Sequence, residues 1–134
     1  MYNKIKDIAE VNNWIFKYAR RDYQNLVNEV DNDNTFLFLD PVQTANEFDE
    51  YNNPVAVNYS GSFLLLKASD FDQDYEGRYV EHIKPLIDST LKQITESIAC
   101  DENLNIQSWN TTEVINLFDM NLDGIAVKYT VIDV

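Results

Sequence analysis

The sequence predicts an α+β domain in which two amphipathic helices pack on one face of a mainly antiparallel sheet, in the order α-β-β-α-β-β. Residues 4–30 and 79–100 repeat apolar side chains every three or four positions, which is typical of helices that bury one side. Strand-like patterns, in which apolar side chains alternate with polar ones or occur in short runs, are found in residues 35–39, 55–67 and 112–133. With 134 residues, the chain is expected to form a single domain.

The first expected helix, residues 4–30, has an apolar stripe that only Asn12 interrupts. The stripe consists of Ile5, Ile8, Ile15, Ala19, Tyr23, Leu26 and Val30. Trp14 lies off this stripe. Near it are Lys17, Arg20 and Arg21, which form the only basic patch in the sequence. Such a patch is either a solvated face with aromatic stems on the core or a contact surface for an acidic neighbour. The sequence leaves both interpretations open, and these four residues are the candidate subunit interface.

The middle of the chain predicts two strands and the second helix. The first strand, 35–39, ends at Asp40-Pro41, and the polar residues 43–53 that follow predict an exposed loop anchored by aromatic side chains. Gly61 predicts a bend within the second strand, 55–67. Pro85 lies inside the helical pattern of 79–100, so the helix is expected either to restart there or to kink.

Both sides of the two middle strands are apolar, although two helices can cover only one face of a sheet. Phe36 and Phe38, for example, point to the opposite side from Leu37. The sequence therefore predicts that a second subunit covers the other face.

The C-terminal strand pair, residues 112–133, contains an Asp-Gly pair that predicts a two-residue hairpin turn at Asp123-Gly124. This turn places Asp119 opposite Lys128 and Ile115 opposite Ile132. The same residues match the beginning of a calcium-binding loop, but the twelfth position is Thr130, which has no carboxylate. The alternating pattern after Gly124 favours the hairpin.

A second candidate metal site precedes the second helix. Asp70, Asp72 and Asp74 alternate, and Glu81 follows where a calcium loop places its last ligand. Tyr75 occupies the position where such loops need glycine. A solvated acidic segment explains the pattern without an ion, so no cofactor or metal is expected.

Charge and missing motifs exclude several functions. The net charge is −13, and residues 31–76 alone carry ten acidic residues against the single Lys67, a balance of −9. This charge disfavours sequence-specific nucleic-acid binding and docking on anionic membranes. The sequence contains no phosphate-binding loop, nucleophile elbow or Cys/His cluster. We therefore expect a non-enzymatic protein.

The ending N-x-F-D-x-N-L-x-G-x-x-V-x-Y-T, residues 116–130, and the phrase YVEHIKPL, residues 79–86, resemble small tail-completion or tail-terminator proteins of tailed bacteriophages. The Asn-rich, acidic composition suits a crAss-like phage. The resemblance implies a virion protein, assembled in the host cytoplasm, that forms a ring of identical subunits at the head–tail connector or tail end. Its partners would be its own copies and neighbouring neck or tail proteins, and DNA would pass through the channel.

A second hypothesis from another class remains open. A small acidic chain can act as a binding module or inhibitor that recognises a basic protein partner through its charge. Ring formation separates the two hypotheses.

Overall fold

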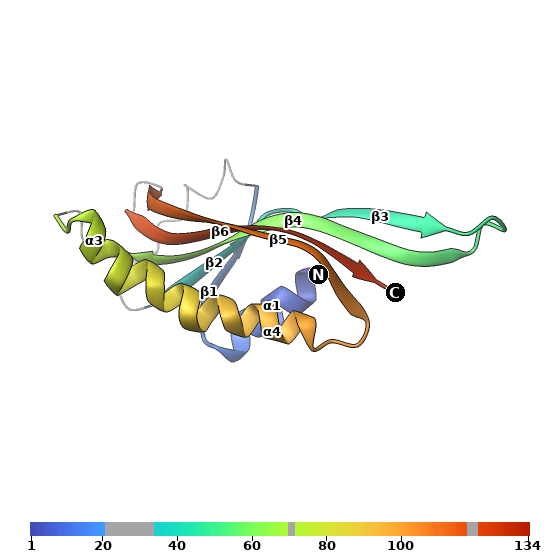
Figure 1. Cartoon of the computed structure of the whole chain (residues 1–134), viewed down its shortest axis with the longest axis horizontal. Coiled ribbons are helices and arrows are strands. Elements are labelled where there is room, and N and C mark those ends of the chain that lie inside the picture. Colours follow the sequence, from blue (N-terminus) through green and yellow to red (C-terminus); the bar gives the residue numbers. More distant parts are fainter. Residues whose placement is uncertain (21–33, 70–71, 118–120) are drawn as a thin grey trace.

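The computed structural model describes residues 1–20, 34–69, 72–117 and 121–134. It consists of a short helix, a six-stranded sheet and one long bent helix, which confirms the predicted α+β class (Figure 1). The described elements follow the order α-β-β-β-β-α-β-β, so the predicted order α-β-β-α-β-β lacked two strands.

The sheet has the strand order β1-β2-β4-β6-β5. The sixth strand, β3, lies outside this order and pairs with the first half of β4, whereas β2 pairs with its second half. The strands are β1 (Ile15–Tyr18), β2 (Thr35–Leu39), β3 (Gln43–Phe48), β4 (Pro54–Ala68), β5 (Leu104–Leu117) and β6 (Leu122–Asp133). Only β1 and β2 pair in parallel; the other pairs are antiparallel. The predicted bounds of β2 are confirmed, and those of β4 differ by one residue at each end.

Both helices pack on the same face of the sheet (Figure 1). The short helix α1 spans Tyr2–Val11. The long helix begins as α3 (Tyr75–Arg78), continues through the π-helical segments η1 (Tyr79–Ile83) and η2 (Leu86–Leu91), and ends as α4 (Lys92–Ala99). Pro85 lies between the two π-helical segments, so the chain bends there without leaving the helix.

The predicted helix over 4–30 is wrong beyond Val11. Asn13 adopts φ 57°, a left-handed conformation that ends a helix, and Asn12 donates a side-chain hydrogen bond to the Ile8 carbonyl at 2.8 Å. Residues 15–18 then form β1, in which aromatic and β-branched side chains fit a pleated surface. The remainder of the predicted helix, residues 21–33, lies outside the described part of the chain.

The apolar part of the second face of the sheet is already buried within one chain, so the apolar side chains there do not require the partner that the sequence predicted to cover them. Phe36, Phe38 and Leu64 are at most 1% exposed. Half-buried side chains of the neighbouring strands, including Ile15 in β1 and Val114 in β5, pack against them. On the same face Asn110, Thr112 and Lys128 remain exposed.

The predicted turn at Asp123-Gly124 is also wrong, because both residues are buried inside β6. Leu117 pairs with Leu122, so the β5–β6 connection lies at 118–121, where Asn121 has φ 52°. Lys128 consequently pairs with Asn110, and Asn105 takes the place opposite Ile132 that was predicted for Ile115. Asp119 lies outside the described residues.

Gly124 serves close packing instead of a turn. A Cβ atom at this position would lie 1.9 Å from the backbone carbonyl oxygen of Leu65 in β4. No side chain fits there, so glycine allows β6 to pair closely with β4.

Phe63, Trp109 and Tyr129 form an aromatic cluster on the helix-covered face, with ring centroids 5.7–6.2 Å apart. Tyr129 Oη and Trp109 Nε1 are buried, and neither has a hydrogen-bond partner in the described structure. Burial, with a smaller contribution from the negative charge of Asp40, raises the pKa of Tyr129 to about 12.

This raised pKa predicts a loss of stability in alkaline solution. Above the ordinary tyrosine pKa of 10, the unfolded chain loses the Tyr129 proton while the folded chain keeps it until about pH 12. The free energy of unfolding should therefore fall by about 1.4 kcal/mol per pH unit in this window. Urea unfolding at pH 9.5 to 11.5 measures it, and Tyr129→Phe should remove this component. An equal decline in both proteins would contradict the prediction.

Candidate functional site

The most prominent surface feature is a two-stranded arm formed by β3 and the first half of β4 (Figure 1). All six residues of β3 are exposed, and in the described structure β3 pairs with β4 alone. The pairing of β4 with β6 ends at Val57 opposite Asp133, so the arm beyond this point has no third strand. The predicted loop at 43–53 is therefore a strand and its turn.

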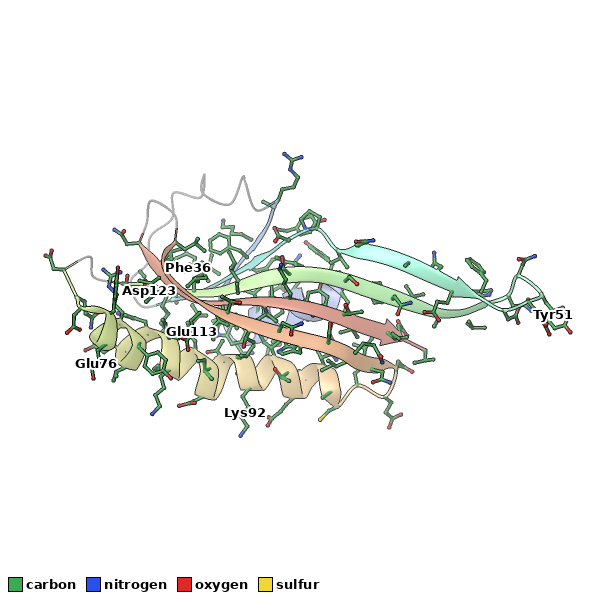
Figure 2. All side chains as sticks on the ribbon, turned by 45° about the horizontal axis from the view of Figure 1, so that its top comes forward. Phe36, Tyr51, Glu76, Lys92, Glu113 and Asp123 are labelled. Carbon is green, nitrogen blue, oxygen red and sulfur yellow. The ribbon has the colours of Figure 1, made fainter. Side chains whose placement is uncertain are left out.

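The tip of the arm is an ordered turn built around Asp49. Its carboxylate accepts hydrogen bonds from the backbone N–H groups of Tyr51 and Asn53, both at 2.9 Å. These bonds, with one from the Asn53 side chain, lower the pKa of Asp49 below its usual value. Asn52 completes the turn with φ 61°. Tyr51 is thereby held at the outermost end of the arm (Figure 2).

The arm combines exposed apolar side chains with acidic ones. Phe48, Tyr51 and Val55 are 59%, 77% and 50% exposed. Glu47, Asp49 and Glu50 lie among them, and residues 41–66 contain no Lys or Arg. Large exposed apolar side chains grouped on a protruding element are typical of protein–protein contact surfaces. The arm is therefore the candidate functional site.

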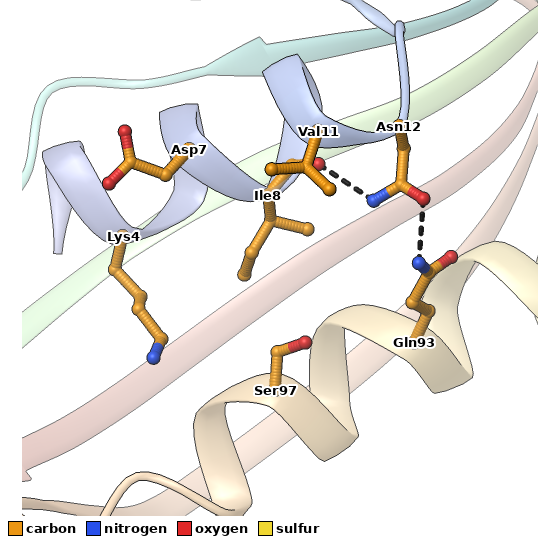
Figure 3. Close-up of a pocket in the computed structure, with 7 residues that line it drawn as sticks. All are labelled: Lys4, Asp7, Ile8, Val11, Asn12, Gln93 and Ser97. Carbon is orange, nitrogen blue, oxygen red and sulfur yellow. Dashed lines mark hydrogen bonds between the residues drawn. The ribbon is translucent and has the colours of Figure 1, made fainter.

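A shallow groove of about 320 Å³ lies between α1 and α4 (Figure 3). It is lined by Lys4, Asp7, Ile8, Val11, Asn12, Gln93 and Ser97. One end is closed by a hydrogen bond of 2.6 Å from Gln93 Nε2 to Asn12 Oδ1. Near the other end, Lys4 Nζ binds the Asp101 carboxylate at 2.9 Å, which lowers the pKa of Asp101. Val11 remains 80% exposed at this groove.

The structure separates the predicted interface residues. Trp14 is half-buried and packs against the helix-covered core, and its backbone N–H donates to the Ala9 carbonyl at 2.9 Å. Lys17 lies on β1 opposite Phe38, and Arg20 is exposed just after this strand. Arg21 lies outside the described residues. Trp14 thus precedes β1, whereas Lys17 lies near the end of β1 and Arg20 follows it, so these three residues do not share one face of a helix.

The candidate metal ligands do not assemble in the part of the chain that the structure describes. Asp74 caps α3 by accepting a hydrogen bond from the Gly77 N–H at 2.7 Å. Asp72 and Glu81 are exposed, and Asp70 lies outside the described residues. The described residues contain no group of three or more His, Cys, Asp or Glu side chains arranged to hold a metal.

Sequence patterns missed the arm tip and the groove for different reasons. Phe48 and Tyr51 were expected to anchor a loop on the core, whereas the turn at Asp49 holds Tyr51 in solvent. The groove joins residues from two helices about 80 positions apart, as the Asn12–Gln93 bond illustrates. The only sequence signal for the tip is a pair of aromatic residues in a stretch that is otherwise polar.

Comparison of the chain with models of known protein families and with curated proteins gave no match. Among the described residues, no helix has both the length and the hydropathy that crossing a lipid bilayer requires.

Proposed function

We propose that this chain is a non-enzymatic virion protein of a tailed bacteriophage, in which identical copies form a ring at the head–tail connector or tail end. The β3–β4 arm carries the proposal. It protrudes from the body with three large apolar side chains exposed, while the apolar side chains on both faces of the sheet behind it form buried clusters. A domain whose core is complete and whose arm is exposed can join its neighbours without refolding.

The shape of the chain supports a ring rather than a two-fold dimer. The arm extends from one end of the molecule and both helices lie away from its tip (Figure 1). A contact between an arm and a different surface of the next copy is heterologous, and heterologous contacts close into rings when the rotation between copies permits. The net charge of −13 also suits a channel lining, because an acidic wall repels the phosphates of passing DNA.

Negative-stain electron microscopy and sizing chromatography with light scattering test the proposal on the full chain. We expect closed rings of uniform diameter as concentration rises to the millimolar range. Arg20→Glu with Arg21→Glu should weaken assembly, because this basic segment is proposed to contact the acidic residues of a neighbour. Lys84→Glu with Lys92→Glu, on the exposed side of the long helix, is the control with the same charge change.

A monomer at every concentration would contradict the ring and favour a second candidate function. In that case the chain would be an acidic binding module that recognises a basic protein. The specific observation in its favour is that the arm carries Glu47, Asp49 and Glu50 and no basic residue. Binding of a basic partner that disappears when these three acids become amides would support this function.

A further inference from the structure

β3 and β5 are the two outer strands of the part of the sheet from which the arm extends. Residues 57–60 of β4 pair with β3 on one side and with β6 on the other, and β6 pairs in turn with β5. The strand order in this part is therefore β3-β4-β6-β5. Within the described residues, β3 pairs only with β4 and β5 only with β6. Each of these outer strands thus presents one edge of backbone N–H and C=O groups that can pair with a further strand.

The middle of β5 has the properties of a strand that can accept another strand. Between its two register shifts, residues 108–114 pair regularly with β6. Asn110, Thr111, Thr112 and Glu113 are all exposed, so neither face of the strand is covered there. β5 contains neither lysine nor proline, the residues with which proteins commonly block an open strand edge. β3 also lacks both, and all six of its residues are exposed.

The directions of the strands allow the two edges to pair head to tail. Each neighbouring pair in the order β3-β4-β6-β5 is antiparallel, so β3 and β5 run in opposite directions. A second copy that is related to the first by rotation about an axis parallel to the strands therefore brings its β3 antiparallel to β5 of the first copy. The antiparallel alternation then continues from one copy to the next, as a heterologous ring contact requires.

The positions of two carboxylates favour this pairing over the pairing of identical strands. Glu113 is opposite Ile125 on the helix-covered face, whereas Glu47 is opposite Ala56, on the same side of β4 as Leu64 of the second face. When β3 pairs with β5 and the faces are kept, these two acids project to opposite sides. Two β5 strands related by a two-fold axis perpendicular to the sheet would place both copies of Glu113 on one face, and two β3 strands would do the same with Glu47. Like charges on neighbouring strands destabilise such pairs.

We infer that the outer edge of β3 in one copy pairs antiparallel with the outer edge of β5 in the next copy. The inference rests on the proposed ring function and identifies the junction that joins one subunit to the next. Main-chain hydrogen bonds then hold the arm on both sides. Because the two edges are different surfaces, each copy binds one neighbour through β3 and another through β5.

Proline at two adjacent positions of β5 tests the pairing. In an edge strand, the N–H groups of neighbouring residues point alternately toward the paired strand and outward. Of Thr111→Pro and Thr112→Pro, one therefore loses a hydrogen bond to β6, whereas the other loses an outward donor and keeps its fold. The folded variant should need at least about a tenfold higher concentration to assemble, because one interchain hydrogen bond is lost and its acceptor stays unpaired. Circular dichroism identifies the folded variant, and sedimentation velocity measures assembly.

The same pair of substitutions in β3, Thr44→Pro and Ala45→Pro, tests the other half of the junction with the same expected result. Tyr75→Pro is the matched control. Tyr75 is 70% exposed at the first position of α3, where proline is well tolerated, and it lies outside both edges. This variant should assemble as the wild type does.

Paired cysteines test the junction without proline, in a Cys100→Ser background. One protein carries Ala45→Cys. Its partner carries a cysteine at one β5 position on the same sheet face, namely Asn105, Ser108, Asn110, Thr112 or Val114. We expect a disulfide-linked dimer in at least one of these mixtures, and none with Thr111→Cys, whose side chain projects to the other face.

The outcomes separate the junction from the ring itself. A link between two Ala45→Cys chains would indicate β3–β3 pairing and overturn the inference. Rings that persist unchanged in the folded proline variants, or wild-type rings without a cross-link in any cysteine mixture, would also overturn it but leave the proposed function intact. A wild-type monomer at every concentration would contradict both.

Discussion

Gly124→Ala is expected to prevent stable folding. The new Cβ atom would lie 1.9 Å from the Leu65 carbonyl oxygen and 2.9 Å from Leu66 Cα, both of them backbone atoms in the buried second half of β4. Backbone in a paired central strand cannot move away without breaking the β4–β6 ladder, the longest pairing in the sheet. We expect a loss of about 4 kcal/mol or more, which is exceptional for one methyl group. Urea unfolding followed by circular dichroism measures this loss.

Gly61→Ala is the matched control for this prediction. Its Cβ atom would meet Tyr129 Oη at 2.9 Å and Tyr129 Cζ at 3.3 Å, so the closest atom belongs to a side chain. Tyr129→Phe removes that oxygen, which has no hydrogen-bond partner in the described structure, and should restore much of the stability lost in Gly61→Ala. If Gly124→Ala cost no more than Gly61→Ala, the close approach of β4 and β6 would not be the cause.

Asp123→Ala is expected to cost about 3–5 kcal/mol, the typical effect of breaking a buried ion pair by removing one partner. Asp123 Oδ1 lies 3.6 Å from Arg78 Nη1, and these side chains are 0% and 2% exposed. The pair joins β6 to the beginning of the long helix. Without Asp123, the buried Arg78 guanidinium group would lose this nearby carboxylate, while its Nε would still donate to the Gln73 carbonyl at 3.0 Å.

The double variant Arg78→Met with Asp123→Leu distinguishes the cost of an uncompensated charge from the cost of lost packing. We expect it to be more stable than Asp123→Ala, because neither remaining side chain needs a charged partner. Lys92→Ala breaks the exposed pair with Glu96 and should change stability by less than about 0.5 kcal/mol. Thermal unfolding by calorimetry compares the three variants. A double variant less stable than Asp123→Ala would indicate that the ion pair is needed for more than charge balance.

Local sequence patterns correctly predicted those strands and helices whose buried apolar side chains are grouped or regularly spaced along the sequence. β2 and β4 have grouped apolar residues, and 79–100 keeps its stripe through Pro85, so each was found with nearly correct bounds. β3 was missed because the arm leaves both of its faces in solvent, and a strand without a buried face has no apolar alternation. β1 was missed because Ile15 continues the apolar stripe of the expected helix, and a strand of four residues is too short to show its own alternation.

The sequence by itself determined the α+β class, the two helices on one face, the acidic surface and the absence of familiar catalytic motifs, because these follow from composition and short-range periodicity. Only the tertiary structure decided what Asp123 and Gly124 do, because an Asp-Gly pair suits a turn and a tightly packed central strand equally well until the neighbouring strand is known. The tertiary structure alone also decided that the apolar part of the second sheet face is buried within the chain, that Tyr51 projects into solvent, and that Val11 faces Gln93 and Ser97 across a groove. Burial and projection depend on contacts between distant segments, which local spacing does not specify.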